Sequence, residues 1–397
     1  MTIRPFAAIR PDPRFVADVA AVPYDVVDTA EARALAAGNP RSFLHVSRPE
    51  IDLADGAGCS SPEAYAQARR ALDRLVGDGT MVRDGAPRFY AYRQTMGSHS
   101  QTGIVATFDT KEYLSGVLKQ HERTRKDKED DRTRHIETLS AHTGPAFLTY
   151  RDDGAIDLVV ADACRREPLY DFVAPDGIGH TVWEVAEASD CAADELVELF
   201  SRVPAAYIAD GHHRSAAAAR YAQAHGFEGE SRWFMAVIFP ASQLKILAYN
   251  RLVRDLNGLS DYEFMSRVSE SFAVGRKGER NCRMYFRGGW LDLSWDLPPS
   301  AGVVGSLDVS YLQDRLLAPV LGIGDPRTDP RISFMGGVRG DAELAAKVDS
   351  GENAVAFAME PVTVGEMMAI ADAGAIMPPK STWFEPKLRS GLFVHAV

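Results

Sequence analysis

The segment from residue 206 to residue 220 constrains the fold of this 397-residue chain more than any other. It begins with a short apolar run, Ala206-Tyr207-Ile208, which is typical of a β-strand. Gly211 then lets the backbone turn, and the alanines at 216 to 219 have the highest helix propensity of any residue type. The sequence therefore predicts a strand that turns sharply into a helix.

The start of this expected helix carries groups that suit a phosphate. A helix N-terminus has unpaired backbone N–H groups and partial positive charge, so it stabilises an anion. Asp210, directly before the turn, is expected to hold a metal ion or a hydroxyl group. The alternative is that Asp210 only caps the helix and that His212 and His213 are polar surface residues. The residues expected to bind a nucleotide here are Gly211, His212, His213, Arg214 and Ser215.

A second informative stretch runs from Lys119 to Arg132 and is dense in charges of both signs. One interpretation is a solvated helix face with ion pairs four residues apart, such as Glu122 with Lys126. The other is a phosphoryl-transfer site, because cations neutralise phosphate charge while a carboxylate deprotonates the attacking hydroxyl. We expect Glu122 to be that base, with His121 beside it. The expected phosphate contacts in this stretch are Arg123, Thr124 and Lys128.

The C-terminal segment 376–391 combines three prolines, two lysines, three hydroxyl side chains and an aromatic pair. Its prolines exclude a regular helix. We expect a rigid loop that closes over the site, with Lys380 and Lys387 as phosphate contacts. A plain surface loop is the alternative.

Length and charge limit the class of protein. A chain of 397 residues exceeds what one core usually supports, so two domains are favoured over one large α/β domain with extensions. The net charge of −11 argues against an extended nucleic-acid or anionic-membrane surface, but it allows a small basic pocket. The four cysteines lie far apart without metal-ligand spacing, which argues against zinc and against a disulfide scaffold. Because no signal segment or membrane-spanning run is recognisable, we expect a cytoplasmic protein.

Several local patterns predict secondary structure near the N-terminus. Residues 28–37 have helix formers behind an Asp-Thr start, and residues 62–76 show amphipathic helical spacing. The runs 87–94 and 101–108 predict a β-hairpin. The run Ser42 to Arg48 predicts a strand that ends at Pro49.

Over essentially its whole length the chain resembles the prokaryotic family known as domain of unknown function 1015. The motifs that carry this resemblance are Val22-Pro23-Tyr24-Asp25-Val26-Val27, Ser42-Phe43-Leu44-His45-Val46, His121-Glu122-Arg123-Thr124 with Lys128-Glu129 and Asp131-Arg132, Ala209-Asp210-Gly211-His212-His213-Arg214, and Met377-Pro378-Pro379-Lys380-Ser381-Thr382-Trp383-Phe384.

The Asp-Gly-His-His-Arg turn is also similar to the nucleotide-binding turn of the ParB/sulfiredoxin-like fold, notably in its free-serine kinases. In those kinases the turn holds phosphates and an upstream glutamate serves as the base. The resemblance places the turn on residues 210–214 here and the base on Glu122. It implies an α/β protein of mixed α+β type, with a ParB/sulfiredoxin-like core and extensions at both ends.

The expected regions are an N-terminal α/β region (1–105), a nucleotide-binding core (106–250) and a C-terminal α/β region (251–397). The expected function is transfer of a phosphoryl group from ATP or ADP to a hydroxylated metabolite, with free L-serine as the leading candidate. Mg²⁺ is the expected metal, held by Asp210. A non-enzymatic, ParB-like nucleotide-binding regulatory module and a nucleotide hydrolase are the alternatives. The expected partners are the nucleotide and the small-molecule substrate, with no nucleic acid and no membrane, and a homodimer remains open.

Overall fold

The computed structural model describes residues 1–54, 58–276, 278–297 and 300–397, and the chain in it divides into two compact units. Unit 1 comprises Met1–Leu244 together with Pro386–Val397, and unit 2 comprises Lys245–Glu385. The C-terminal segment 376–391 is therefore divided between the two units. The first part, which contains Lys380, belongs to unit 2, and the second part, which contains Lys387, belongs to unit 1.

A large mixed sheet forms the centre of unit 1. Its strands β11 and β6 are parallel, as are β12 and β8, whereas the other neighbours are antiparallel. This confirms a mixed α/β fold. The strands, in spatial order, are β6 (Leu118–Lys119), β11 (Ala206–Asp210), β8 (Ala146–Tyr150), β12 (Trp233–Pro240), β5 (His99–Asp109), β4 (Arg88–Met96), β10 (Gly179–Glu187) and β9 (Tyr170–Val173), with β1 (Ile3–Arg4) paired to β5.

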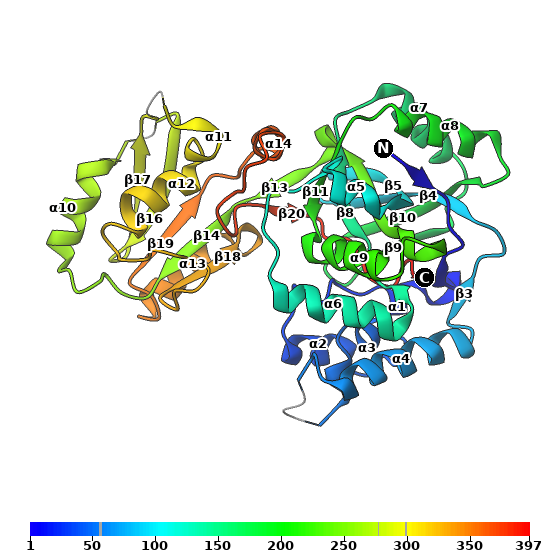
Figure 1. Cartoon of the computed structure of the whole chain (residues 1–397). Coiled ribbons are helices and arrows are strands. Elements are labelled where there is room, and N and C mark those ends of the chain that lie inside the picture. Colours follow the sequence, from blue (N-terminus) through cyan, green and yellow to red (C-terminus); the bar gives the residue numbers. More distant parts are fainter. Residues whose placement is uncertain (55–57, 277, 298–299) are drawn as a thin grey trace. The chain divides into compact units, whose positions relative to one another are not determined.

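The main core of unit 1 lies on one face of this sheet. Alternate strand residues such as Leu148 and Ile208 point to that face, as the two-residue period of a strand requires. They pack against buried side chains of α7 (Gly154–Ala163) and α8 (Cys191–Ser201), including Phe200. Figure 1 shows α7 and α8 above the sheet, and α9 (His212–Ala224), α6 (Lys126–Leu139) and α4 (Pro62–Gly77) below it.

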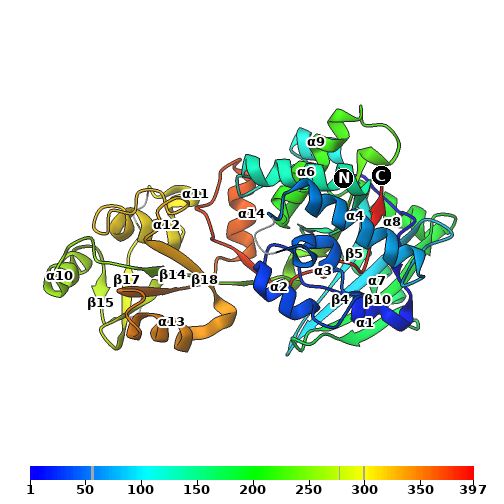
Figure 2. The same ribbon diagram turned by 90° about the horizontal axis from the view of Figure 1, so that it is seen from below.

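A second core joins the N-terminal helices to the C-terminal end of the chain. Leu72 and Leu75 of α4 pack with Phe43 and Val394. Strand β21 (His395–Ala396) pairs with β7 (Ala141–His142), so the last residues return to unit 1. The remaining α-helices and β-strands of this unit are α1 (Val16–Val19), α2 (Thr29–Ala36), α3 (Leu44–Ser47), α5 (Thr110–Ser115), β2 (Ile9–Pro11) and β3 (Met81–Arg83). Figure 2 shows α2, α3 and α4 together on this side of the unit.

Unit 2 is built on an antiparallel sheet whose core includes Leu252, Met335 and Leu344. Its strands, in spatial order, are β15 (Ala273–Val274), β17 (Gly289–Trp295), β16 (Arg280–Phe286), β19 (Val355–Met359), β14 (Tyr249–Val253) and β18 (Ile332–Gly336), and β13 (Lys245–Leu247) pairs separately with β20 (Trp383–Glu385). The helices are α10 (Asp261–Ser271), α11 (Gly302–Gly305), α12 (Asp308–Leu312), α13 (Gly340–Asp349) and α14 (Val364–Asp372).

Most local predictions near the N-terminus are confirmed, including the helices α2 and α4 and the β4–β5 hairpin. The expected strand from Ser42 to Arg48 is wrong, because residues 44–47 form the short helix α3. The Ser42 hydroxyl accepts a hydrogen bond from the Leu44 backbone N–H, which starts the turn locally. The Ser47 hydroxyl donates to the Phe43 carbonyl in the same helix.

In the described part of the chain, no helix combines the length and the apolar character that crossing a membrane requires.

Candidate functional site at the start of helix α9

The predicted strand, turn and helix are present. Strand β11 ends at Asp210, Gly211 adopts a left-handed conformation with φ of +90°, and α9 begins at His212. Within the described ranges, no side chain caps the N-terminus of α9, so its first N–H groups have no side-chain acceptor there. A Cβ atom at Gly211 would meet the Arg214 guanidinium at 3.0 to 3.1 Å. Glycine is therefore required both by the backbone angle and by the close approach of Arg214.

Asp210 does not cap this helix with its carboxylate but sits among cations. One carboxylate oxygen accepts from the Gly211 backbone N–H at 2.9 Å. The other lies 3.4 Å from the Lys387 ammonium and 3.6 Å from the Arg214 guanidinium. Burial by itself would raise the pKa of Asp210, but the Lys387 and Arg214 charges outweigh it and hold the pKa well below its usual range.

Three further residues of the turn carry hydrogen-bonding groups toward the helix start. The His213 Nε2 accepts from the Arg125 backbone N–H at 3.0 Å, so its other ring nitrogen carries the proton. The Arg214 guanidinium donates to the Pro145 carbonyl. Among the described residues, the buried Nε of Arg214 and the buried hydroxyl of Ser215 have no hydrogen-bond partner. Buried polar groups of this kind are usually satisfied, so they mark a place that a ligand can complete.

The pairing of β6 with β11 brings the second charged stretch to this turn. Leu118 pairs with Ala206 and Lys119 with Tyr207 in parallel register. Because parallel strands end at the same edge of a sheet, the residues after β6 lie beside the residues after β11. His121 and Glu122 therefore lie beside the start of α9.

Two buried imidazoles meet at this edge. The rings of His121 and His212 are edge to face with centroids 4.6 Å apart, and the two residues are 1% and 6% exposed. A ring nitrogen of His121, a ring nitrogen of His212 and a carboxylate oxygen of Glu122 all lie within 4.8 Å of one another. Burial lowers the pKa of His121 to about 4 and, for His212, lowers it well below the usual value. Both imidazoles are therefore neutral at pH 7.

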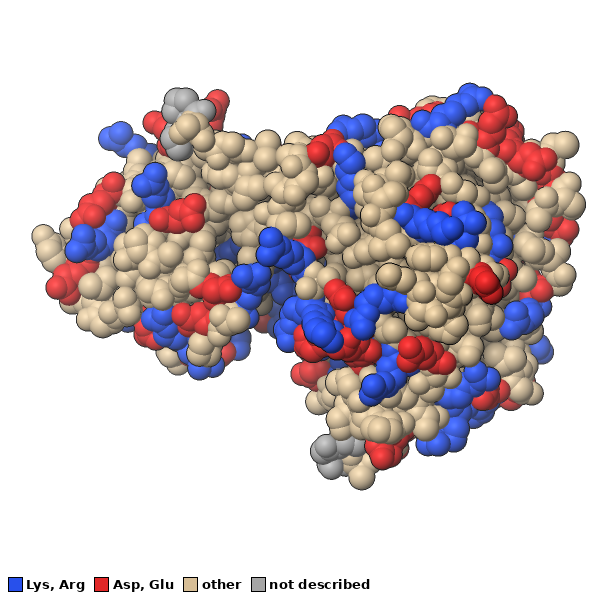
Figure 3. Space-filling view, in the orientation of Figure 1, with Lys and Arg blue, Asp and Glu red and all other residues tan. Residues whose placement is uncertain are grey.

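The charged stretch after β6 does not form the ion-paired helix face that was expected around Glu122. Helix α6 begins only at Lys126, whose ammonium pairs with Asp130 at 2.8 Å instead of with Glu122. The Glu122–Lys126 pairing across a helix is therefore wrong. Figure 3 shows Lys and Arg mixed with Asp and Glu over the start of α6.

The other expected phosphate contacts have different surroundings. The Thr124 hydroxyl donates to the Glu129 carboxylate, and Arg123 and Lys128 are exposed. Lys380 belongs to unit 2, where its ammonium lies 3.5 Å from the Tyr249 hydroxyl. Lys380 and the turn thus belong to different units, whereas Lys387 contacts Asp210 directly.

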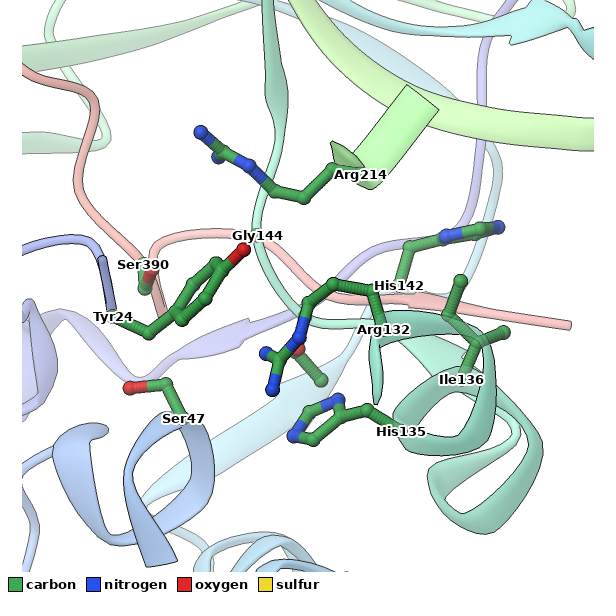
Figure 4. A pocket seen from close by; sticks show the side chains of 10 residues that line it. Tyr24, Ser47, Arg132, His135, Ile136, His142, Gly144, Arg214 and Ser390 are labelled. Carbon is green, nitrogen blue, oxygen red and sulfur yellow. The ribbon is translucent and has the colours of Figure 1, made fainter. Parts of the chain in front are cut away.

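A pocket beside the turn was not predicted. Arg132 and Arg214 both line it (Figure 4). Arg132 is held by the Asp131 carboxylate at 2.6 Å and lies 4.1 Å over the Tyr24 ring. The other lining residues are Tyr24, Ser47, His135, Ile136, His142, Thr143, Gly144 and Ser390. Tyr24 and Arg132 both lie in motifs that carry the family resemblance, which was the available signal for this pocket.

These observations define an α/β protein with an uncapped helix start beside two buried histidines and a glutamate. The chain belongs to the family described as "Protein of unknown function (DUF1015)", whose model matches residues 3–310. No curated protein matches the chain.

Several solved structures are similar to the chain at low identity. A conserved hypothetical protein from Pyrococcus furiosus is 14% identical, with 74% of this chain and 95% of that chain covered and a TM-score of 0.37. A free serine kinase in complex with AMP is 13% identical, with 73% and 91% covered and a TM-score of 0.38. SbnI with a C-terminal truncation, from Staphylococcus aureus, is 12% identical, with 74% and 87% covered and a TM-score of 0.43.

Proposed function

We propose that this protein transfers a phosphoryl group from ATP or ADP to a small hydroxylated metabolite, with free L-serine as the leading candidate. The observation that carries the proposal is the position of Glu122. Its carboxylate lies within 4.8 Å of a ring nitrogen of His212, the first residue of a helix whose N-terminus no described side chain caps. A base and a phosphate-binding element are thus adjacent, as phosphoryl transfer requires.

The helix start fits the phosphates of a nucleotide. Its backbone N–H groups attract negative charge, and the unsatisfied Arg214 Nε and Ser215 hydroxyl add donors at the same place. His213 contributes the N–H of its other ring nitrogen as a hydrogen-bond donor. We assign Gly211, His212, His213, Arg214 and Ser215 to the nucleotide phosphates, and Arg123, Thr124 and Lys128 to the edge of the same site.

Asp210 fits a magnesium ion only in part. Mg²⁺ prefers carboxylate and phosphate oxygens, and it is usually held by one or two carboxylates together with the substrate phosphates. Asp210 offers one carboxylate, whose charge Lys387 and Arg214 already balance. We therefore assign Asp210 to Mg²⁺ only when the nucleotide supplies the remaining ligands.

Glu122 is the proposed base for the acceptor hydroxyl. It would accept the hydroxyl proton as the oxygen attacks the terminal phosphorus, and the bond from that phosphorus to its bridging oxygen breaks. His121 is neutral, so we assign it a positioning role. A ring N–H of His121 donates to the Ile208 carbonyl, which fixes the backbone next to Glu122 against β11.

The pocket lined by Arg132 and Arg214 is the proposed site for the rest of the acceptor. Two guanidinium groups favour an anionic ligand, and a guanidinium binds a carboxylate through paired hydrogen bonds. Arg214 belongs to both the turn and the pocket, so an acceptor bound there lies near the phosphates. A small hydroxy acid or amino acid such as serine matches these features. We also propose that the strand, turn and helix belong to a ParB/sulfiredoxin-like core.

Phosphorus NMR tests the reaction. Purified protein is incubated with Mg²⁺, ATP or ADP and a pool of hydroxylated metabolites that includes L-serine. The proposal predicts a new phosphomonoester signal that disappears when one metabolite is omitted. Free phosphate alone would identify a hydrolase, and intact nucleotide that nevertheless binds would favour a regulatory module.

A further inference from the structure

Two buried histidines and a glutamate form a cluster at the carboxyl end of β6 and β11. One ring nitrogen each from His121 and His212 and a carboxylate oxygen of Glu122 lie within 4.8 Å of one another. His121 and Glu122 follow β6, and His212 is the first residue of α9. The β6–β11 pairing and the Gly211 turn together fix their proximity.

The state of His212 points to a missing ligand. His212 is 6% exposed, and its Nε2 atom has no hydrogen-bond partner among the described residues. A buried polar atom without a partner is uncommon in folded proteins, and a bound ion is one way to complete it. An imidazole nitrogen that carries a lone pair is a ligand that transition metals prefer.

The second histidine shows the arrangement typical of a metal ligand. A ring N–H of His121 donates to the Ile208 carbonyl, which leaves the other ring nitrogen as the one with a lone pair. Histidines that bind metals usually donate their second ring N–H to a backbone carbonyl or a carboxylate in this way. The bond to Ile208 therefore orients the His121 ring before any ion binds.

We propose that His121, Glu122 and His212 bind a divalent transition-metal ion of the zinc and cobalt class. Two imidazoles and one carboxylate suit such an ion better than Mg²⁺ or Ca²⁺, which prefer oxygen ligands. Three protein ligands leave an open position for water or a hydroxyl group.

The geometry requires a small closure. Bonds of about 2.0 to 2.1 Å place tetrahedral ligands about 3.4 Å apart. Separations of up to 4.8 Å therefore have to shorten, by up to about 1.4 Å, when the three side chains close around an ion.

The metal site does not rest on the proposed kinase activity, although it involves the same glutamate. When Glu122 binds the ion, its carboxylate is no longer available to accept the acceptor proton. Zinc is therefore expected to inhibit a magnesium-dependent kinase reaction through this site. The binding itself is measured without any nucleotide, so failure of one proposal is distinguishable from failure of the other.

The test is titration of metal-free protein with Co²⁺, which gives visible d–d absorption in a nitrogen and oxygen site of low coordination number. The wild-type chain is expected to bind one equivalent. Glu122→Gln and His212→Ala are each expected to weaken binding at least tenfold. The matched control is His213→Ala, on the same turn but outside the cluster, and it is expected to retain the wild-type spectrum.

Two further measurements separate metal loss from misfolding. Glu122→Gln keeps the side-chain volume, and circular dichroism with thermal unfolding verifies that each variant is folded. Zn²⁺ is expected to raise the Tm of the wild type but not of the folded Glu122→Gln variant. The proposal is overturned if wild type binds no Co²⁺, if folded Glu122→Gln binds it as tightly as wild type, or if His213→Ala abolishes binding equally.

Discussion

The ammonium group of Lys387 lies 3.4 Å from a carboxylate oxygen of Asp210, although 177 residues separate the two along the chain. Both side chains are largely buried, with 14% and 26% exposed. The contact attaches the C-terminal part of unit 1 to the candidate site and balances the charge of Asp210.

Replacing Lys387 with Met removes this balance while it keeps most of the side-chain volume. We expect a loss of about 1 to 2 kcal/mol in the free energy of unfolding, because a partly buried carboxylate loses a cationic partner. Urea denaturation measures it. Lys126→Met is the control, because its exposed pair with Asp130 should contribute no more than about 0.5 kcal/mol. Equal effects of the two substitutions would contradict the role given to Lys387.

Replacing Gly211 with Ala tests the turn. The φ of +90° disfavours any side chain, and the new Cβ would displace the Arg214 guanidinium. Gly116→Ala is a matched control, because Gly116 has a φ of +80° and a Cβ added there would meet nothing within 4 Å. Both variants should lose about 1 kcal/mol of stability through the backbone.

Nucleotide binding separates these two glycine variants. Only Gly211→Ala should weaken nucleotide binding, by roughly tenfold, because a hydrogen bond to a charged group contributes on the order of 1.5 kcal/mol or more. Isothermal titration calorimetry measures the affinity. Unchanged affinity in folded Gly211→Ala would show that Arg214 does not bind the phosphates.

The buried His135 predicts a dependence of stability on pH. Burial lowers the pKa of His135 to about 3, from about 6.5 in the unfolded chain. Between these values the unfolded state binds one more proton than the folded state. The free energy of unfolding therefore falls as the pH falls below 6.5, by about 1.4 kcal/mol per pH unit for this residue.

His135→Gln removes that titration. The variant should show a shallower loss of stability between about pH 6.5 and pH 4.5, by about 1.4 kcal/mol per pH unit. Above about pH 7.5 the curves of the two proteins should run parallel. Urea denaturation at each pH provides both curves, and an unchanged slope in the variant would contradict a buried neutral His135.

A substitution of Arg132 tests whether the pocket binds the acceptor. Arg132→Lys keeps the charge but loses the planar guanidinium, which pairs with Asp131 through Nε and one terminal nitrogen and lines the pocket. The KM for the acceptor should rise about tenfold or more, while the affinity for the nucleotide stays within a few-fold. Arg134→Lys, on the exposed side of the same helix, is the control and should leave both values unchanged. A rise in KM that Arg134→Lys matches would remove Arg132 from the pocket's function.

The strand, the turn and the helix start could be predicted because each depends on local chemistry. Gly211 permits the turn, and the alanines of α9 favour a helix whatever surrounds them. The secondary structure of the run Ser42 to Arg48 was harder to predict, because short apolar segments fit a strand or a helix equally well. In the structure the Ser42 hydroxyl accepts from the Leu44 backbone N–H at the start of the helix.

The site was predictable only as separate pieces. His121 and Glu122 could be identified as candidates, but their place beside His212 depends on the pairing of β6 with β11, which no local pattern reveals. The pocket combines Tyr24, Arg132 and Ser390 from three distant segments. For the same reason, the partner of Lys387 could not be identified from the sequence.

The most direct test of the proposed function compares turnover and nucleotide affinity in Glu122→Gln. Production of the phosphomonoester is followed by phosphorus NMR, and nucleotide binding is measured by calorimetry in the presence of EDTA and then of Mg²⁺ alone. Glu137→Gln, an exposed position on α6, is the matched control and should behave as wild type. We predict that Glu122→Gln loses at least about a hundredfold in turnover, typical of a missing general base, while the nucleotide affinity stays within a few-fold. Turnover near the wild-type rate, or an equal loss of turnover and affinity, would contradict the assignment of Glu122 as the base.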